Sequence, residues 1–158
     1  MNATKNRQVE KTWTADEILA KMEHFCAYRE RCPQEVRRKL AELGAEGETA
    51  EQIYSVLEAD GFFNEARFAG AFAGGKFRVN QWGRVRIRLE LRQRGISPAI
   101  IREALEAIGE DEYRGVLQRL IEKRRQQWPS PNDAAARSKT AAAMIRAGYE
   151  PELVFRYL

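Results

Sequence analysis

The sequence is poor in the residue types that most metal sites and many catalytic sites use. Its 158 residues include one histidine, His24, and two cysteines, Cys26 and Cys32. A structural zinc site needs four ligands, drawn mostly from Cys and His, and a single histidine argues against a catalytic triad. A disulfide between the two cysteines is disfavoured in a reducing compartment, so we expect ordinary buried or half-buried thiols. The sequence therefore predicts no metal site and no cofactor.

Long apolar runs are also missing. No stretch of about 18 uncharged apolar residues exists, so no membrane span is expected. The stretch 1–11 is polar and resembles no signal peptide, which makes the cytoplasm the expected location. Gly70, Gly74 and Gly75 do not have the spacing of a phosphate-binding loop. We therefore expect neither an enzyme nor a small-molecule substrate.

Charge, by contrast, is abundant at 32% of residues, and it is segregated. The stretch 40–66 has seven acidic and no basic residues, whereas 67–102 has nine basic residues and one acidic residue, Glu90. Such segregation is typical of a protein that meets charged partners with different parts of its surface. The alternative is that the acidic and basic stretches neutralise each other within the fold.

Signals for helix starts and helix ends recur along the chain. Thr14 with Glu17, and Thr49 with Gln52, have the spacing of a capping box, and Ser97 precedes a proline suited to a first helical turn. Glycines follow apolar-periodic runs, as at helix ends that need a positive φ; these are Gly44, Gly61, Gly95, Gly109 and Gly148. After a disordered tail over 1–12, we predict helices at 15–29, 34–43, 50–60, 65–77, 83–94, 98–108, 111–128, 134–147 and 151–157.

The predicted helices group in threes. The second helix of each group ends at Gly44, Gly95 or Gly148, which lie 51 and 53 residues apart. The third helices carry apolar residues at i, i+3 and i+4, the face that a helix buries; the aligned sets are Ile53, Val56 and Leu57, then Ile101, Ala104 and Leu105, then Val154, Tyr157 and Leu158. We therefore predict an all-α fold of three tandem three-helix repeats, 13–61, 62–109 and 110–158, each stacking on the next.

One segment has a strand-like pattern. Val85, Ile87, Leu89 and Leu91 alternate with charged residues, and this period of two is a strand signature. We nevertheless predict a helix, because no second strand pattern lies nearby to pair with it.

The basic stretch supplies the candidate binding residues, because arginine carries fixed charge and forks onto phosphate or carboxylate. The arginines of 83–94 spread around most of a helical wheel, so some must pair internally. A second basic cluster ends the seventh predicted helix, near Trp128. Trp82 and Trp128 could stack on unpaired bases, whereas we expect Phe77 in the core. The candidate set is Arg67, Lys76, Arg78, Arg84, Arg86, Arg88, Arg92, Arg94, Lys123, Arg124 and Arg125.

Two segments in the middle of the chain follow a recognisable pattern. The first contains Arg67, Phe68 and Ala69, and the second has the spacing Gly-x-x-x-Ile-x-x-x-Leu-x-x-x-Gly-Ile, filled by Gly83, Ile87, Leu91, Gly95 and Ile96. This pattern resembles the RecX family. That family usually has Asp where this chain has Asn64. Asn caps a helix about as well as Asp, so only a charge-dependent contact at this position is put in doubt.

The resemblance implies an elongated, curved array of three-helix repeats without cofactor or catalytic residues. It also implies a regulator of the RecA recombinase, which binds the groove of the RecA filament on DNA. There it would limit filament extension and suppress ATP hydrolysis, strand exchange and co-protease activity. We accordingly expect a cytoplasmic monomer that acts in recombination, DNA repair and the SOS response. Its partners would be the RecA filament and DNA, contacted directly or through the filament.

Two other functions fit the same sequence. Three-helix units with a basic second helix can resemble helix-turn-helix modules that read duplex DNA directly. A helical-repeat scaffold for an unrelated protein is the other.

Overall fold

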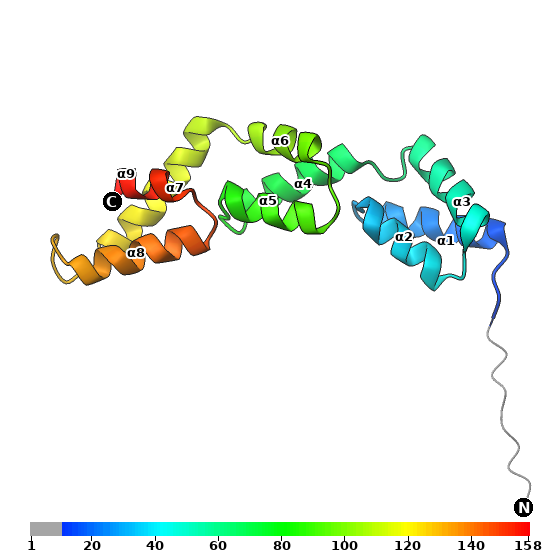
Figure 1. Cartoon of the computed structure of the whole chain (residues 1–158), viewed down its shortest axis with the longest axis horizontal. Coiled ribbons are helices and arrows are strands. Elements are labelled where there is room, and N and C mark those ends of the chain that lie inside the picture. Colours follow the sequence, from blue (N-terminus) through cyan, green and yellow to red (C-terminus); the bar gives the residue numbers. More distant parts are fainter. Residues whose placement is uncertain (1–10) are drawn as a thin grey trace, which may run out of the picture. The chain divides into compact units, whose positions relative to one another are not determined.

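The computed structural model describes residues 11–158, which are helical wherever they are regular (Figure 1). The helices are α1 (Ala15–Tyr28), α2 (Pro33–Glu42), α3 (Gly47–Ala59), α4 (Glu65–Arg78), α5 (Arg84–Gln93), α6 (Pro98–Glu106), α7 (Glu110–Arg125), α8 (Ala134–Arg146) and α9 (Pro151–Tyr157). The all-α prediction is confirmed, and the strand-like segment lies in α5. The predicted tail over 1–12 lies outside the described residues except for its last two.

Most of the predicted helix ends are confirmed by their caps. Thr14 and Glu17 form the capping box of α1, with the Glu17 N–H donating to the Thr14 hydroxyl at 3.2 Å and the Thr14 N–H to the Glu17 carboxylate at 3.0 Å. The φ angles are positive at four of the five glycines expected to end helices: Gly44, Gly61, Gly95 and Gly148.

Two local predictions are wrong. Helix α3 begins at Gly47, so Thr49 lies inside its first turn and no capping box forms there, because the amide three residues on already belongs to the helical ladder. Gly109 has a φ of −59° and caps the start of α7 instead of ending α6. Ser97 is the N-cap of α6 with Pro98 in its first turn, as predicted, although its side chain makes no cap bond.

The alignment of the first and second repeats also needs correction. Helices α3 and α6 begin at Gly47 and Pro98, 51 residues apart like Gly44 and Gly95. Ile53 therefore corresponds to Ala104, and not to Ile101 as the apolar pattern indicated. The pattern was misleading because it counted Val56, which is 41% exposed, as part of the buried stripe.

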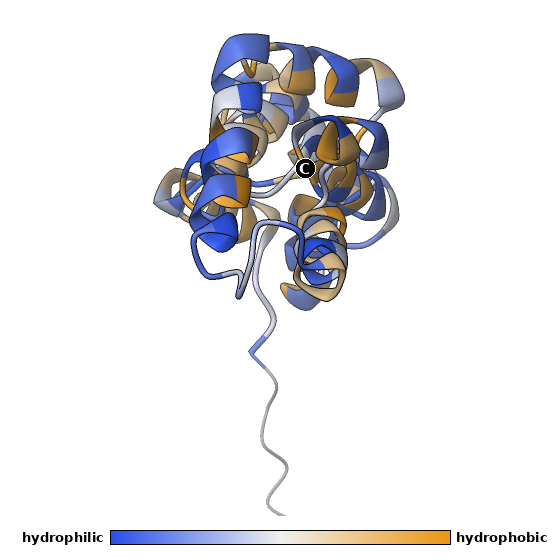
Figure 2. Ribbon diagram, turned by 90° about the vertical axis from the view of Figure 1, so that its left-hand side faces the viewer, coloured by the Kyte–Doolittle hydropathy of each residue, from blue (hydrophilic) through white to orange (hydrophobic). Residues whose placement is uncertain are grey.

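The described chain separates into two compact units. The first contains Gln34–Phe62 with the described part of Met1–Arg29, and the second contains Glu30–Pro33 and Phe63–Leu158. In the first unit α1, α2 and α3 bury Met22, Val36, Leu40 and Leu57. The division into three repeats stays a prediction. In Figure 2 single helices carry both hydrophobic and hydrophilic residues, as amphipathic helices do.

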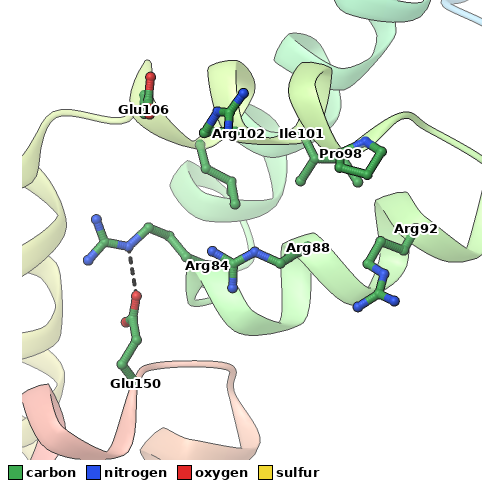
Figure 3. Close-up of a pocket in the computed structure, with 9 residues that line it drawn as sticks. Arg84, Arg88, Arg92, Pro98, Ile101, Arg102, Glu106 and Glu150 are labelled. Atoms are coloured by element: carbon green, nitrogen blue, oxygen red, sulfur yellow. Dashed lines mark hydrogen bonds and ion pairs between the residues drawn. The ribbon is translucent and has the colours of Figure 1, made fainter.

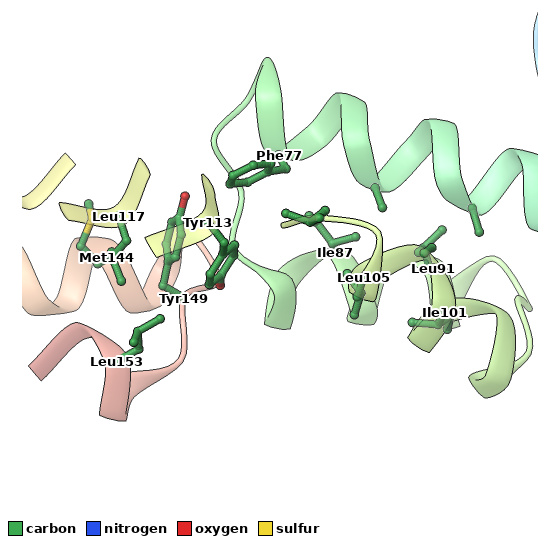
Figure 4. Packing of buried hydrophobic residues seen from close by; sticks show 14 of the residues in the cluster. Phe77, Ile87, Leu91, Ile101, Leu105, Tyr113, Leu117, Met144, Tyr149 and Leu153 are labelled. Carbon is green, nitrogen blue, oxygen red and sulfur yellow. The ribbon is translucent and has the colours of Figure 1, made fainter. Parts of the chain in front are cut away.

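The second unit has one continuous apolar core that spans α4 to α9. Aromatic rings connect its two ends (Figure 4): Phe77 on α4 packs on Tyr113 of α7 with centroids 5.7 Å apart, and Tyr113 packs on Tyr149 at 5.2 Å. The expected place of Phe77 in the core is confirmed, since its side chain is fully buried. This core fixes α5 and α6 against the third helical group.

Backbone contact between two glycines ties α5 to the end of α8. The Gly83 N–H donates to the Ala147 carbonyl and the Val85 N–H to the Gly148 carbonyl, both at 2.9 Å. A Cβ on Gly83 would lie 2.2 Å from the Gly148 carbonyl carbon, so only glycine permits this approach. The first turn of α5 has no side-chain cap, and these carbonyls satisfy N–H groups that a helix start leaves open.

The remaining absences concern the described part of the chain. Cys26 and Cys32 are both buried, as expected. Residues 11–158 contain no group of three or more His, Cys, Asp or Glu side chains placed to hold a metal ion. Among the same residues, no helix has the length and apolar character needed to cross a membrane.

Candidate partner-binding site

A groove of about 630 Å³ runs between α5 and α6 in the second unit. Four arginines line it, Arg84, Arg88 and Arg92 from α5 and Arg102 from α6 (Figure 3). The apolar side chains of Pro98, Ile101 and Leu105 on α6 complete its lining, with Glu106 and Glu150 beside them. The arginines of α5 line one side of the groove because they recur every fourth residue, at positions 84, 88 and 92.

Arg84 is committed to contacts within the protein. Its Nε donates to Glu150 Oε1 at 2.9 Å and its Nη1 to Glu110 Oε2 at 2.8 Å. Although burial opposes the charged form, the two carboxylates hold the pKa of Arg84 above its ordinary value. Arg84 therefore joins α5 to α7 and α9 and is not available as a free cation.

Tyr113 completes this network. Its hydroxyl accepts from the Arg84 backbone N–H at 3.0 Å and donates to Glu150 Oε2 at 2.6 Å. The Arg84 guanidinium lies 3.8 Å from the centre of the Tyr113 ring, within cation–π distance. Burial, and then the hydrogen bond to Glu150, raise the pKa of Tyr113. Each polar group of the cluster thus has a partner, as a buried network requires.

Arg88, Arg92 and Arg102 differ from Arg84, because each is exposed. Within residues 11–158 none of these three guanidinium groups makes an ion pair or a side-chain hydrogen bond. In Figure 3 they project from the two helices that form the groove. With Arg84 paired to Glu150, the three exposed arginines outnumber the one other carboxylate of the lining, Glu106, so the groove can attract an anionic group.

The other predicted site residues are dispersed, and most have internal partners. Arg67 pairs with Glu30, Arg78 with Glu112, Arg94 with Glu90, and Arg125 with Glu122. Arg125 also donates to the Tyr157 carbonyl at 2.8 Å, so it holds the chain end as well. Lys123 and Arg124 are exposed on α7.

The tryptophans that were candidates for stacking on bases also have contacts inside the fold. The Arg86 guanidinium lies 3.8 Å from the centre of the Trp82 ring, and the Lys76 ammonium lies 4.9 Å from it. The Trp128 Nε1 donates to the Thr140 hydroxyl at 3.0 Å.

The ion pairs bear on the alternative that the acidic and basic stretches neutralise each other. Arg78, Arg84 and Arg94 all pair with carboxylates outside 40–66. From the acidic stretch, Glu51 pairs with Arg37, which precedes the basic stretch. The free arginines of the groove are therefore not compensated by 40–66.

Sequence reasoning missed Arg102 as a site residue. It was counted in the basic stretch, but nothing in the pattern of α6 alone marks it out. The available signal was its place one turn after Pro98, which puts it on the side of α6 that meets the arginines of α5.

Comparison with known proteins now adds the family. A family model described as RecX, second three-helix domain, matches residues 64–105. Two relatives bear the name regulatory protein RecX. The one from Pseudomonas fluorescens strain Pf-5 is 32% identical over 148 residues, covering 92% of this chain and 87% of its own length. The one from Herminiimonas arsenicoxydans is 29% identical and covers 84% of each chain. This chain belongs to the RecX family.

Solved RecX structures share the fold. The crystal structure of RecX from Lactobacillus salivarius superposes with a TM-score of 0.83 at 17% identity, over 90% of this chain and 93% of the other. A second RecX crystal structure superposes with a TM-score of 0.76 at 18% identity, over 90% and 72%. At such identities the likeness concerns the fold alone.

The residues that match the RecX pattern have structural roles in this chain. Ile87, Leu91 and Ile96 are buried, and Gly95 has a φ of +76° where α5 ends. Gly83 makes the close approach to Gly148. Asn64 caps α4 by accepting from the Arg67 N–H at 2.8 Å, as expected for Asn in place of Asp. The pattern thus specifies the fold, and the free arginines lie between its members.

Proposed function

We propose that this RecX protein is a non-enzymatic regulator that binds the filament formed by RecA on DNA. It would limit filament extension and slow ATP hydrolysis and strand exchange, and so control recombination and DNA repair in the cytoplasm. Family membership supports a regulatory role. The proposal is placed on a surface by the α5–α6 groove, where Arg88, Arg92 and Arg102 make no ion pair within residues 11–158.

A nucleoprotein filament suits such a surface. It presents DNA phosphates and protein carboxylates side by side, and arginine binds either of them in a forked geometry. Binding that uses these charges should weaken as salt rises, because exposed charges are screened and counterions are released. A regulator of this kind acts by occupying a surface, so it needs no catalytic residue.

The test is the rate of DNA-dependent ATP hydrolysis by RecA, titrated with this protein. We expect the rate to fall at protein concentrations below that of RecA, since a bound regulator affects neighbouring subunits of the filament. An unchanged rate across a wide range of concentrations would rule out the proposed function. Tight binding to one duplex sequence in the absence of RecA would instead support a direct reader of DNA.

A further inference from the structure

The first unit contains a groove that corresponds to the α5–α6 groove. It lies between α2 and α3 and has a volume of about 320 Å³. Helices α2 and α5 begin 51 residues apart, as do α3 and α6. With this offset Arg37 corresponds to Arg88, and Glu51 corresponds to Arg102.

The groove of the first unit is neutralised from within. Arg37 Nη1 and Glu51 Oε1 are 2.7 Å apart, and the Arg37 guanidinium lies 3.9 Å from the centre of the Tyr54 ring. The hydrogen bond that Arg37 donates to Glu51 raises the pKa of Arg37. The positive charge of Arg37 on α2 is therefore paired with a carboxylate from the facing helix, α3.

The groove of the second unit has the opposite charge at the same place. Arg102 stands where Glu51 would supply the carboxylate, and Arg92 stands where the first unit has Ala41. The groove consequently contains one arginine that is paired, Arg84, and three that are not. In the second unit, an anionic group from another molecule would take the place that the Glu51 carboxylate has in the first unit.

Apolar side chains near the groove favour one class of anionic partner over another. Ile101 and Leu105 form its floor but are buried, at 2% and 5% exposed. The apolar side chains that a partner can reach are Pro98, which lines the groove, and Val85 and Leu89 on the next row of α5, which lie outside the lining and are 43% and 53% exposed. Exposed apolar side chains beside arginines match a protein segment with both carboxylates and apolar side chains. A nucleic-acid strand matches less well, because no aromatic ring lines the groove on which bases could stack and two glutamates border it.

We propose that the α5–α6 groove binds an acidic segment of a partner protein, whose carboxylates pair with Arg88, Arg92 and Arg102 while an apolar side chain contacts the exposed Pro98 and Leu89. This inference rests on the proposed function in one respect, that the partner is the protein part of the filament.

The experiment measures binding of three labelled probes to the full chain by fluorescence anisotropy. The first is a short peptide in which glutamate and leucine recur at helical spacing, the second has serine in place of leucine, and the third is a single-stranded oligothymidylate of equal charge. We expect the glutamate–leucine peptide to bind with the lowest dissociation constant. Equal binding of the two peptides would overturn the apolar part of the proposal, and preference for the oligothymidylate would make the groove a nucleic-acid site.

The decisive variant is R102E, which recreates the Arg37–Glu51 arrangement within the second groove. Because the new glutamate can pair with Arg88, we expect the variant to unfold at the same temperature as the wild type. Its dissociation constant for the glutamate–leucine peptide should rise by roughly tenfold or more, since an attractive charge becomes a repulsive one. The matched control is R119E, the same charge change at an exposed position of α7 outside the groove.

Three further outcomes keep the inference separate from the proposed function. Peptide binding by R102E equal to that of wild type, with R88A/R92A also unaffected, would overturn the groove as the binding site. If wild-type protein slows ATP hydrolysis by RecA and R102E slows it equally, the groove inference fails while the proposed function stands. If wild-type protein leaves RecA unaffected, the proposed function fails, and the peptide measurement still decides what the groove binds.

Discussion

At the scale of single residues, two glycines set how α5 meets the end of α8. Gly148 has a φ of +104°, and a Cβ there would lie 2.4 Å from the Cβ of Arg86 and 2.8 Å from its backbone nitrogen. Both the backbone conformation and the lack of space exclude a larger residue. The helix that carries the free arginines is therefore positioned by a contact that involves no functional side chain.

We predict that G148A lowers the free energy of unfolding by about 3 kcal/mol, through positive-φ strain and overpacking together. The control is G70A in α4, where an added Cβ has no neighbour within 4 Å and φ is not positive. That substitution should stabilise by up to about 1 kcal/mol, because alanine favours a helix over glycine. Chemical denaturation measures both, and equal stabilities of the two variants would contradict the close approach.

Tyr149 gives the protein a dependence on alkaline pH. Burial, and then the charge of Glu150, raise the pKa of Tyr149 to about 12, and its hydroxyl donates to the Gln81 carbonyl at 2.9 Å. An unfolded tyrosine ionises near pH 10. The contribution of protonated Tyr149 to the free energy of unfolding is therefore complete below pH 10. It is lost as the pH rises towards 12, because the tyrosine of the unfolded chain releases its proton at a lower pH than Tyr149 of the folded protein.

We predict that the free energy of unfolding falls by about 1 kcal/mol between pH 9 and 11 through this group alone. Y149F should reduce that loss, whereas Y28F, at a position that is 81% exposed, should leave it unchanged. Denaturant midpoints measured across this pH range provide the comparison. A pH dependence that is identical in wild type and Y149F would contradict the role given to Tyr149.

At the scale of elements, the burial of the residues of α5 shows why its sequence has a strand-like pattern. Ile87 and Leu91 are fully buried, one helical turn apart, whereas Val85 and Leu89 are apolar but exposed. Two apolar pairs on different sides of one helix together produce a period of two. The pattern thus mixes a core requirement with a surface one, and the missing partner strand was the observation that resolved it.

We predict that L91A and L89A differ strongly in stability. Truncation of the buried Leu91 should cost about 3 kcal/mol, within the range for large-to-small changes in a core. Truncation of Leu89 should change the free energy of unfolding by less than about 0.5 kcal/mol. In a strand both residues would share one face, so similar losses in thermal denaturation would contradict the helix.

Substitutions of two arginines of α5 should likewise differ in their effect on stability. R84A removes the ion-pair partner of Glu150 and leaves Glu110 with Arg114 alone, and we predict a loss of about 2 kcal/mol in the free energy of unfolding. R88A removes no ion pair and should be within about 0.5 kcal/mol of wild type. If denaturation shows R88A to be the less stable variant, the assignment of Arg84 to the fold and Arg88 to the partner is wrong.

Helix positions could be predicted because their signals are local. Thr14 with Glu17, and the glycines at 44, 61, 95 and 148, act within a few residues of the helix end that they specify. The start of α3 was missed because Thr49 imitates a cap one turn too late. Sequence periodicity cannot correct such an error when exposed residues such as Val56 are also apolar.

The candidate site was less predictable because it depends on distant pairing. Arg84 and Arg88 occupy equivalent positions on consecutive turns of α5. Contacts with Glu110 and Glu150, 26 and 66 residues along the chain, separate the structural arginine from the free one. The sequence predicted that some arginines of 83–94 pair internally, but it could not say which.

At the scale of the whole molecule, the fold and the proposed binding surface draw on different residues. The residues shared with the RecX pattern fill the core or permit close backbone contacts, so family membership identifies the architecture. The free cations of the α5–α6 groove lie outside that pattern. A regulator built in this way can keep its fold while its binding surface is altered, which makes surface variants informative.

The most direct test of the account is ATP hydrolysis by RecA on single-stranded DNA, titrated with wild-type protein and with R88A/R92A. Arg84 is kept in this variant because it supports the fold. We predict that wild-type protein slows hydrolysis, and that the variant, equally stable by thermal denaturation, needs a concentration roughly tenfold higher or more for the same effect. Equal inhibition by the two proteins would contradict the account.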